Sequence, residues 1–188
     1  MLNNFKKRFY FTLPCSRELK NIVKLPLLEK ESKDKIISIW KERYENNKYV
    51  ISDYINKCKY ELIKNNCKNN AHFIIPSKNE NGFINFYSQF IDTKLVFITP
   101  LQSYYQYKHN SVPYITLNFF DDLKNKDIIL TKLNIVNNTI TKEQAIKFYN
   151  YIISFYSDFN YFQYVNKFNN DSRNFNYNDF FNKFKQLF

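Results

Sequence analysis

The spacing of apolar residues changes twice along this chain, and no other feature limits its possible folds as strongly. Residues 33–46 repeat apolar side chains at three- and four-residue intervals, which predicts an amphipathic helix. Over residues 71–135 the apolar runs are short, β-branched and aromatic, as strands are. Helical spacing returns over residues 141–156. Helices before and after a block of strands predict an α+β domain.

The strand block predicts an antiparallel sheet with one covered face. Five runs have strand character, at residues 71–76, 82–91, 94–100, 113–119 and 127–135. In the run 82–91, one side is clearly more apolar than the other. The apolar side comprises Ile84, Phe86, Ser88 and Phe90, and the mixed side comprises Phe83, Asn85, Tyr87 and Gln89. We therefore expect a single domain with an antiparallel β-sheet and helices that are N-terminal, C-terminal and packed on one face.

Capping residues and prolines indicate where the N-terminal helices begin and end. Ser16 is expected to cap a short helix that is broken at Pro26. Ser32 is the expected N-cap of the amphipathic helix that follows it. The apolar spacing after Ser52 predicts another helix, which ends near Asn66.

The C-terminal part of the chain carries the clearest helix start. Thr141 and Gln144 have the spacing of a capping box, and an apolar stripe follows them through residue 156. Two more helical stretches are expected near residues 160–168 and 177–187.

Residues 1–16 form a basic segment without any acidic residue. The apolar residues that share one face of its helical wheel are Leu2, Phe5, Phe9 and Leu13. Such a segment is typical of a mitochondrial targeting sequence, and the alternative interpretation is a disordered basic tail. We therefore divide the chain into a targeting segment at 1–16 and one domain at 17–188. No apolar run reaches the roughly 18–20 residues that span a bilayer.

Several kinds of catalytic and cofactor chemistry find no motif in this sequence. The chain has one glycine, so a glycine-rich phosphate loop cannot be built, and we expect neither nucleotide hydrolysis nor a cofactor. No set of cysteines and histidines has zinc spacing, and we expect no metal. Cys58 and Cys67 are interpreted as small buried residues. A small hydrolase that uses Cys67 or His109 remains an alternative.

The aromatic segment Ser103–Asn110 is the remaining candidate for function. Its tyrosines can pack under neighbouring helices, contact a protein partner, or stack on nucleic-acid bases. The formal net charge is +11, but residues 1–24 hold six Lys or Arg and a single acid, Glu18. The remainder mixes both signs, unlike the basic stripe of a nucleic-acid-binding protein. A small RNA-binding module is the main alternative function, and steeply salt-dependent RNA binding by the domain without residues 1–24 would favour it.

From about Leu19 to Leu187 the chain resembles the family of mitochondrial assembly factors that chaperone the β subunit of the catalytic F1 head of ATP synthase. The segment "LKNIVKLPLLEKESKDKIISIWKERY" is similar to the entry helices of that family. The segments "HFIIPSKNENGFINFYSQF" and "FITPLQSYYQY" carry its strand and Tyr-Gln signatures. The segments "DDLKNKDIILTKLNI", "TITKEQAIKFYNYIISFY", "YVNKFN" and "FNYNDFFNKF" follow in the order of the family. The matching positions are Ile39, Trp40, Pro76, Gly82, Gln89, Thr99, Leu101, Tyr105, Gln106, Ala145, Phe155 and Tyr156.

The chain departs from the family pattern at a few positions. Ile98 separates Phe97 from Thr99, which the family has adjacent. Ser77 stands where the family usually has an arginine, and His109–Ser111 stands where it has an acidic residue. Asp127 replaces a glycine. If these positions contact the partner, the contact differs in this chain.

The resemblance implies a chaperone that is not an enzyme and works without ATP in the mitochondrial matrix. Its implied partner is the free β subunit, which it holds until the α subunit replaces it. We expect the contact on the uncovered side of the sheet and on the connection after it. The candidate contact residues are Gln89, Thr99, Tyr105, Gln106 and Tyr107.

Overall fold

The computed structural model describes residues 15–80 and 82–187, apart from the side chain of residue 109. The expected targeting segment at 1–16 therefore lies almost entirely outside the described residues. Within the described ranges, no helix combines the length and apolar character needed to cross a membrane.

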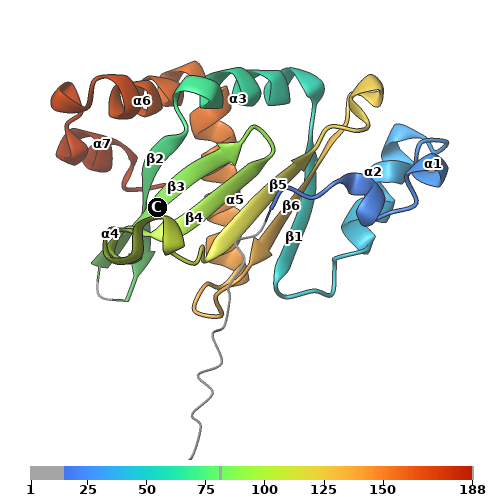
Figure 1. Cartoon of the computed structure of the whole chain (residues 1–188), viewed down its shortest axis with the longest axis horizontal. Coiled ribbons are helices and arrows are strands. Elements are labelled where there is room, and N and C mark those ends of the chain that lie inside the picture. Colours follow the sequence, from blue (N-terminus) through green and yellow to red (C-terminus); the bar gives the residue numbers. More distant parts are fainter. Residues whose placement is uncertain (1–14, 81, 188) are drawn as a thin grey trace, which may run out of the picture.

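The described chain is a six-stranded antiparallel sheet surrounded by helices (Figure 1), which confirms the predicted α+β class. The strands are β1 (Val50–Ile55), β2 (His72–Asn79), β3 (Gly82–Asp92), β4 (Leu95–Pro100), β5 (Ile115–Phe120) and β6 (Ile129–Ile135). The helices are α1 (Leu25–Leu28), α2 (Lys33–Glu42), α3 (Lys57–Asn69), α4 (Leu101–Tyr107), α5 (Lys142–Ser157), α6 (Phe159–Asn170) and α7 (Tyr177–Phe184). Short 3-10 helices occur at Leu19–Asn21, Lys108–Asn110, Lys124–Lys126 and Ser172–Asn174.

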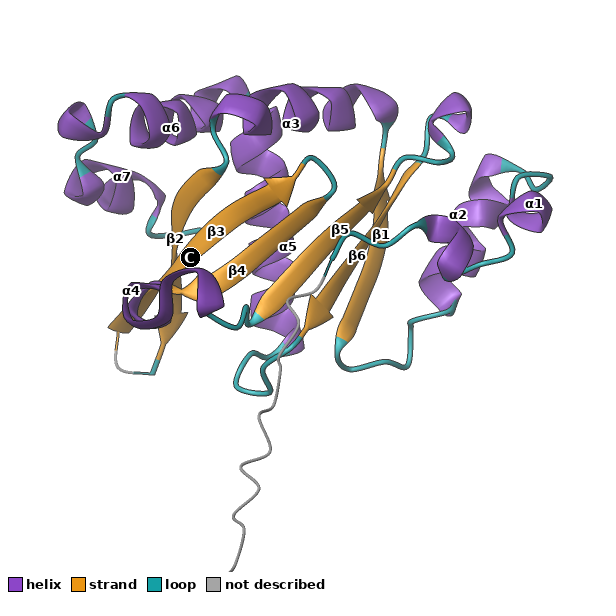
Figure 2. Cartoon of the chain, in the orientation of Figure 1, coloured by secondary structure: helices purple, strands orange, loops and turns teal. Residues whose placement is uncertain are grey.

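The strand order is β1-β6-β5-β4-β3-β2, so β1 and β2 form the two edges of the sheet. Figure 2 shows α5 crossing behind the strands, with α3 and α6 along one end of the sheet. On the viewer's side, α2 lies near the β1 edge and α4 lies near the lower ends of β3 and β4. The sheet therefore has one face covered by α5 and one face that the described helices cover only at its margins.

The main core lies between the sheet and α5. The alternation predicted for β3 is confirmed, because Phe86 and Phe90 are buried and contact Phe148 and Tyr156 of α5. Ser88 lies between them on the same side of the strand, and its hydroxyl donates to the carbonyl of Phe73 at 3.2 Å. This hydrogen bond removes the cost of burying a polar side chain in an apolar layer.

A smaller core lies between α2 and the other face of the sheet. Trp40 is 1% exposed, and its indole N–H donates to the carbonyl of Thr131 at 2.9 Å. Its ring meets those of Phe120 and Tyr44 edge-on, with centroids 5.7 and 5.3 Å away. The predicted cap of α2 is confirmed, since the Ser32 hydroxyl accepts from the backbone of Lys35.

The predicted helix after Ser52 is wrong in its first part. Residues Val50–Ile55 form strand β1, in which Ile51 faces Leu133 and Ile55 faces Ile129 of β6. A four-residue spacing fits one helical turn and also two steps along one face of a strand, so the pattern did not distinguish them. The helix, α3, begins after Asn56, whose side chain accepts from the Lys59 backbone at 2.8 Å.

Other boundaries also differ from the sequence-based expectation. Pro26 does not break a helix but lies in the first turn of α1. Backbone N–H groups in the first turn make no hydrogen bond within the helix, so a proline, which has no N–H, is tolerated there. The turn before it is a 3-10 helix at Leu19–Asn21 without a side-chain cap, so Ser16 caps nothing. Helix α2 ends at Glu42 rather than at residue 46. The capping box of Thr141 and Gln144 is present as predicted.

Asp127 stands where the family resemblance leads us to expect a glycine, and its backbone conformation accounts for that expectation. Its φ of 58° lies in the left-handed region, which glycine and, less readily, Asp and Asn adopt. Its carboxylate accepts from the Lys57 backbone N–H at 2.9 Å and from the Lys33 side chain at 2.8 Å. The hydrogen bond from Lys33 is the main cause that lowers the pKa of the Asp127 carboxyl.

We expect Asp127→Ala to lower the Tm by about 2–4 °C, because it loses these bonds and alanine tolerates a positive φ poorly. Asp127→Gly keeps the backbone conformation and should lose less. A thermal melt followed by circular dichroism measures both, and equal losses would contradict the role of φ.

The same residue predicts a pH dependence with a defined sign. A carboxyl whose pKa is lowered in the folded state stabilises the fold above its ordinary value of 3.8. That stability is lost as the pH falls through the lowered pKa. Asp127→Asn should therefore differ from the wild type near neutral pH and converge with it in acid.

Candidate functional site

Strands β3 and β4 place two of the predicted contact residues on one face of the sheet. Tyr87 faces Thr99, and Gln89 faces Phe97, in the register of the two strands. Gln89 is half-buried, whereas Thr99 is only 5% exposed. Thr99 therefore offers little surface to a partner in this conformation.

The other three predicted residues lie on α4, which follows β4 directly. Tyr105 is 63% exposed, Tyr107 is 55% exposed, and Gln106 between them is exposed as well. It is unusual for two large aromatic side chains to be exposed on one short helix. A tyrosine ring carries much apolar area, which is removed from water when the ring finds a partner. The structure therefore gathers Tyr105, Gln106 and Tyr107 into one displayed surface, which we call the α4 surface (Leu101–Tyr107).

Helix α4 is held to the sheet by an aromatic stack that the sequence analysis did not identify. The ring of Tyr104 lies 4.3 Å from that of Tyr87, and His72 stacks on the other side of Tyr87 at 5.5 Å. Ser111 also donates to the carbonyl of Ser103 at 2.9 Å and so fixes the end of the connection. The alternation of β3 had placed Tyr87 on this face, but only the fold brings Tyr104 to it.

Burial shifts the pKa values of two members of the stack toward their uncharged forms. Burial, helped by the neighbouring Tyr104, raises the pKa of Tyr87 far above its ordinary value. Burial also lowers the pKa of His72, whose Nδ1 is buried without a hydrogen-bond partner among the described residues. Burial therefore favours the neutral forms of Tyr87 and His72 at the base of the α4 surface.

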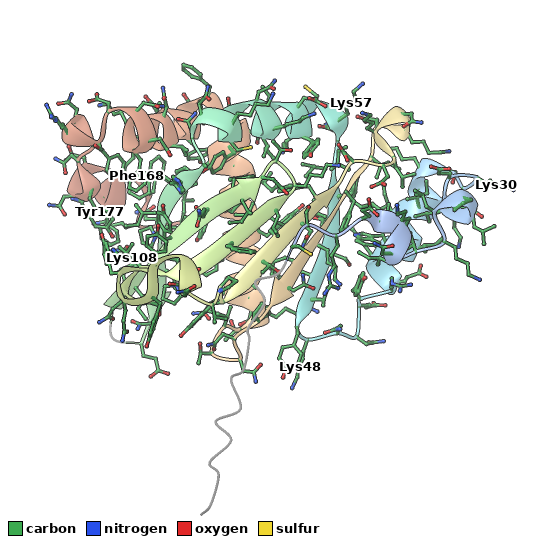
Figure 3. The ribbon with its side chains drawn as sticks, viewed as in Figure 1. Lys30, Lys48, Lys57, Lys108, Phe168 and Tyr177 are labelled. Atoms are coloured by element: carbon green, nitrogen blue, oxygen red, sulfur yellow. The ribbon has the colours of Figure 1, made fainter. Side chains whose placement is uncertain are left out.

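A lysine ammonium lies near one of the exposed rings at the end of α4. Lys108, which follows it, has a φ of 51°, and its ammonium lies 5.4 Å from the centroid of the Tyr105 ring. Figure 3 shows Lys108 beside α4 at the sheet end away from α3. Such a contact orients the ring without burying it.

A pocket of about 460 Å³ lies beside the α4 surface. Its apolar side chains include Phe86, Pro100 and Ile140, and Gln102, Gln106 and Gln144 contribute amides. Amide side chains both donate and accept hydrogen bonds, so they can pair with the backbone of a bound polypeptide. Gln106 belongs both to this pocket and to the exposed helix surface.

The structure separates the two cysteines that the sequence analysis singled out into one buried and one exposed thiol. Cys67 is 3% exposed, as predicted, and burial raises the pKa of its thiol to about 11, so it stays protonated. Cys58 is exposed, and its interpretation as a buried residue is wrong, because it lies on the outer side of α3. Among the described residues, no group of three metal-ligating side chains comes together.

The protein is therefore an α+β protein that presents aromatic and amide side chains beside an open antiparallel sheet. Such a surface is suited to contact another polypeptide. The chain belongs to the ATP11 protein family, whose sequence profile matches residues 12–181. This is the family of mitochondrial assembly chaperones for F1-ATPase, and it is not a family of enzymes. A comparison with curated proteins gave no match.

Membership implies a mitochondrial location and a subunit of ATP synthase as partner. The identification agrees with the resemblance found from the sequence motifs.

Proposed function

We propose that this protein is an ATP-independent chaperone that binds the free β subunit of the F1 head in the mitochondrial matrix. It holds the β subunit until the α subunit takes its place. The proposal includes no nucleotide, metal or nucleic acid.

The observation that supports this proposal is the display of Tyr105 and Tyr107 on a helix held in place by Tyr104. Exposed tyrosines on a fixed element lose little conformational entropy when a partner covers them. Tyrosine is also enriched among the residues that contribute most to protein–protein affinity. The amides of the neighbouring pocket suit the polar groups of a polypeptide surface better than they suit a charged ligand.

The physical mechanism needs no fuel. A free β subunit exposes the surfaces that α subunits cover in the assembled head, and large exposed apolar surfaces drive aggregation. A chaperone that covers one of them with moderate affinity suppresses this reaction. Since α and the chaperone compete for the same protein, the exchange depends only on their relative affinities.

Co-expression with isolated subunits tests the proposal. We expect the chain to keep the β subunit soluble, to leave the α subunit aggregated, and to release β when α is added. The measurement is the soluble fraction of each subunit, followed by size-exclusion chromatography of the complex.

Two results would contradict the proposal. One is rescue of the α subunit alone, or of neither subunit. The other is tight, steeply salt-dependent RNA binding by the domain without residues 1–24, which would support the alternative of an RNA-binding module.

A further inference from the structure

The two edge strands of the sheet differ in how their outer backbone groups are satisfied. Next to β2, the N–H of Phe90 donates to the carbonyl of Ala71. Because residues along an edge strand direct their backbone N–H and C=O alternately toward the neighbouring strand and away from it, those of His72 and Pro76 point away from β3. Asn169 of α6 satisfies both groups of His72, donating to its carbonyl at 2.6 Å and accepting from its N–H at 3.1 Å. Pro76 has no N–H to expose. The β2 edge is therefore blocked against strand pairing at these two outward positions.

The β1 edge is capped at its start, where the N–H of Val50 donates to the carbonyl of Asn47 at 3.4 Å, but it is open at Ser52. The N–H of Ile135 donates to the carbonyl of Tyr49 at 2.8 Å. This hydrogen bond shows which residues of β1 direct their backbone groups toward β6. By alternation, Val50, Ser52 and Tyr54 point their backbone groups outward. The N–H and C=O of Ser52 have no hydrogen-bond partner within the part of the chain that the structure describes. Strand β1 also contains no proline.

A groove of about 300 Å³ lies along the first half of this edge. Val50, Ile51 and Ser52 line it from the strand. The end of α2 and the turn after it form one wall, and the start of α5 forms the other. The wall residues are Lys41, Glu42, Tyr44, Glu45, Lys142 and Ile146. Ile146 is 41% exposed, although the other apolar side chains of α5 are buried.

We propose that this groove binds an extended segment of the F1 subunit that the protein chaperones, by adding a strand to β1. The inference rests on the proposed function and assigns to it a second contact surface, apart from the α4 surface. The N–H and C=O of Ser52 pair with the backbone of the segment, as in other strand-addition complexes. Because an extended backbone offers donors and acceptors at the spacing of a strand, it is the ligand that matches this edge.

The walls select the side chains of the bound segment. Tyr44 and Ile146 give apolar contacts on its two faces. Lys41 already pairs with Asp53 at 2.9 Å, and the Lys142 ammonium lies 3.5 Å from the carbonyls of Glu45 and Asn47. These cations are engaged with this chain, and the carboxylates of Glu42 and Glu45 also line the walls. The groove therefore disfavours an acidic segment and fits one rich in β-branched or aromatic residues.

A second copy of this chain fits the edge poorly. Pairing of two β1 strands brings the α2 and α5 helices of each copy toward those of the other, on both faces of the new sheet. The groove is bounded on both sides by these helices, so it admits a single strand without bulky neighbours.

Binding of isolated β subunit to full-length variants tests the inference. Ser52→Pro removes the outward N–H at an edge position, where proline is tolerated, and we expect it to weaken binding about tenfold or more. Ser52→Ala keeps the backbone donor and is the matched control, with an expected change of less than about twofold. Circular dichroism and thermal melting of both variants establish that each is folded.

Hydrogen exchange of the wild-type protein gives a second readout that does not depend on a variant. Amides of residues 50–54 should exchange more slowly in the complex with β than in the free chain. Equal affinity of Ser52→Pro and wild type, with no added protection at 50–54, would overturn the inference while leaving the proposed function intact. Concentration-dependent self-association that Ser52→Pro abolishes would overturn it too, since the edge would then pair copies of this chain. Failure of the wild type to bind β at all would instead remove the proposed function.

Discussion

Replacing Tyr105 and Tyr107 together by alanine should weaken binding of the isolated β subunit by about 100-fold while leaving the fold intact. Each truncated tyrosine at the centre of an interface commonly costs about 1–2 kcal/mol or more, and about 1.4 kcal/mol corresponds to a tenfold change. The fold should persist because both rings are more than half exposed and support no core contact. Titration calorimetry with refolded β subunit measures the loss.

A matched control separates specific contact from general stickiness. Phe159 is 84% exposed at the start of α6, away from the α4 surface, so Phe159→Ala removes an exposed ring without touching the proposed interface. We expect its affinity to equal that of the wild type. Equal losses in the two variants would mean that the tyrosines contribute only non-specific apolar area.

Phe73→Ala should lower the free energy of unfolding by about 3–5 kcal/mol, the usual cost of removing a buried phenylalanine and leaving a cavity. Phe73 is fully buried in β2, and its ring lies 5.1–5.7 Å from those of Phe155, Phe168 and Phe180. These partners belong to α5, α6 and α7, so one side chain joins three helices to the sheet. Urea denaturation measures the change.

The fluorescence of the single tryptophan tests whether Phe73→Ala destabilises the whole protein or only part of it. Trp40 lies in the smaller core under α2, distant in sequence from Phe73 and outside its ring contacts. If the sheet unfolds cooperatively, Trp40 fluorescence and far-ultraviolet circular dichroism should shift to lower urea together. An unchanged fluorescence transition would mean that α6 and α7 detach alone. Phe73→Leu, which keeps most of the volume, should cost much less.

Local sequence patterns predicted the elements whose spacing was long and unambiguous. The capping box at Thr141, the cap at Ser32 and the alternation of β3 were all found correctly, because each depends on residues close together in the chain. Strand β1 was missed, since Tyr54 and Ile55 continue the helical spacing of Cys58, Leu62 and Ile63. Only the pairing of β1 with β6, nearly 80 residues later, makes this segment a strand.

The candidate site divides in the same way. Tyr105 and Tyr107 of α4 were named as contact candidates from the family resemblance and from their polar and aromatic character, and their role as contacts stays a prediction. The stack of His72, Tyr87 and Tyr104 was not predicted, because its members come from β2, β3 and α4. The unpaired edge of β1 was not predicted either, since an edge is defined by the strand order of the whole sheet.

The amino-acid sequence by itself determined the α+β class and the family, because periodicity and motif order can be read from residues that are neighbours in the chain. The tertiary structure alone decided which outward backbone groups at the sheet edges have partners, which tyrosines are buried and which remain exposed. Burial and hydrogen-bond satisfaction depend on residues that are far apart in the chain, and packing decides which of them meet.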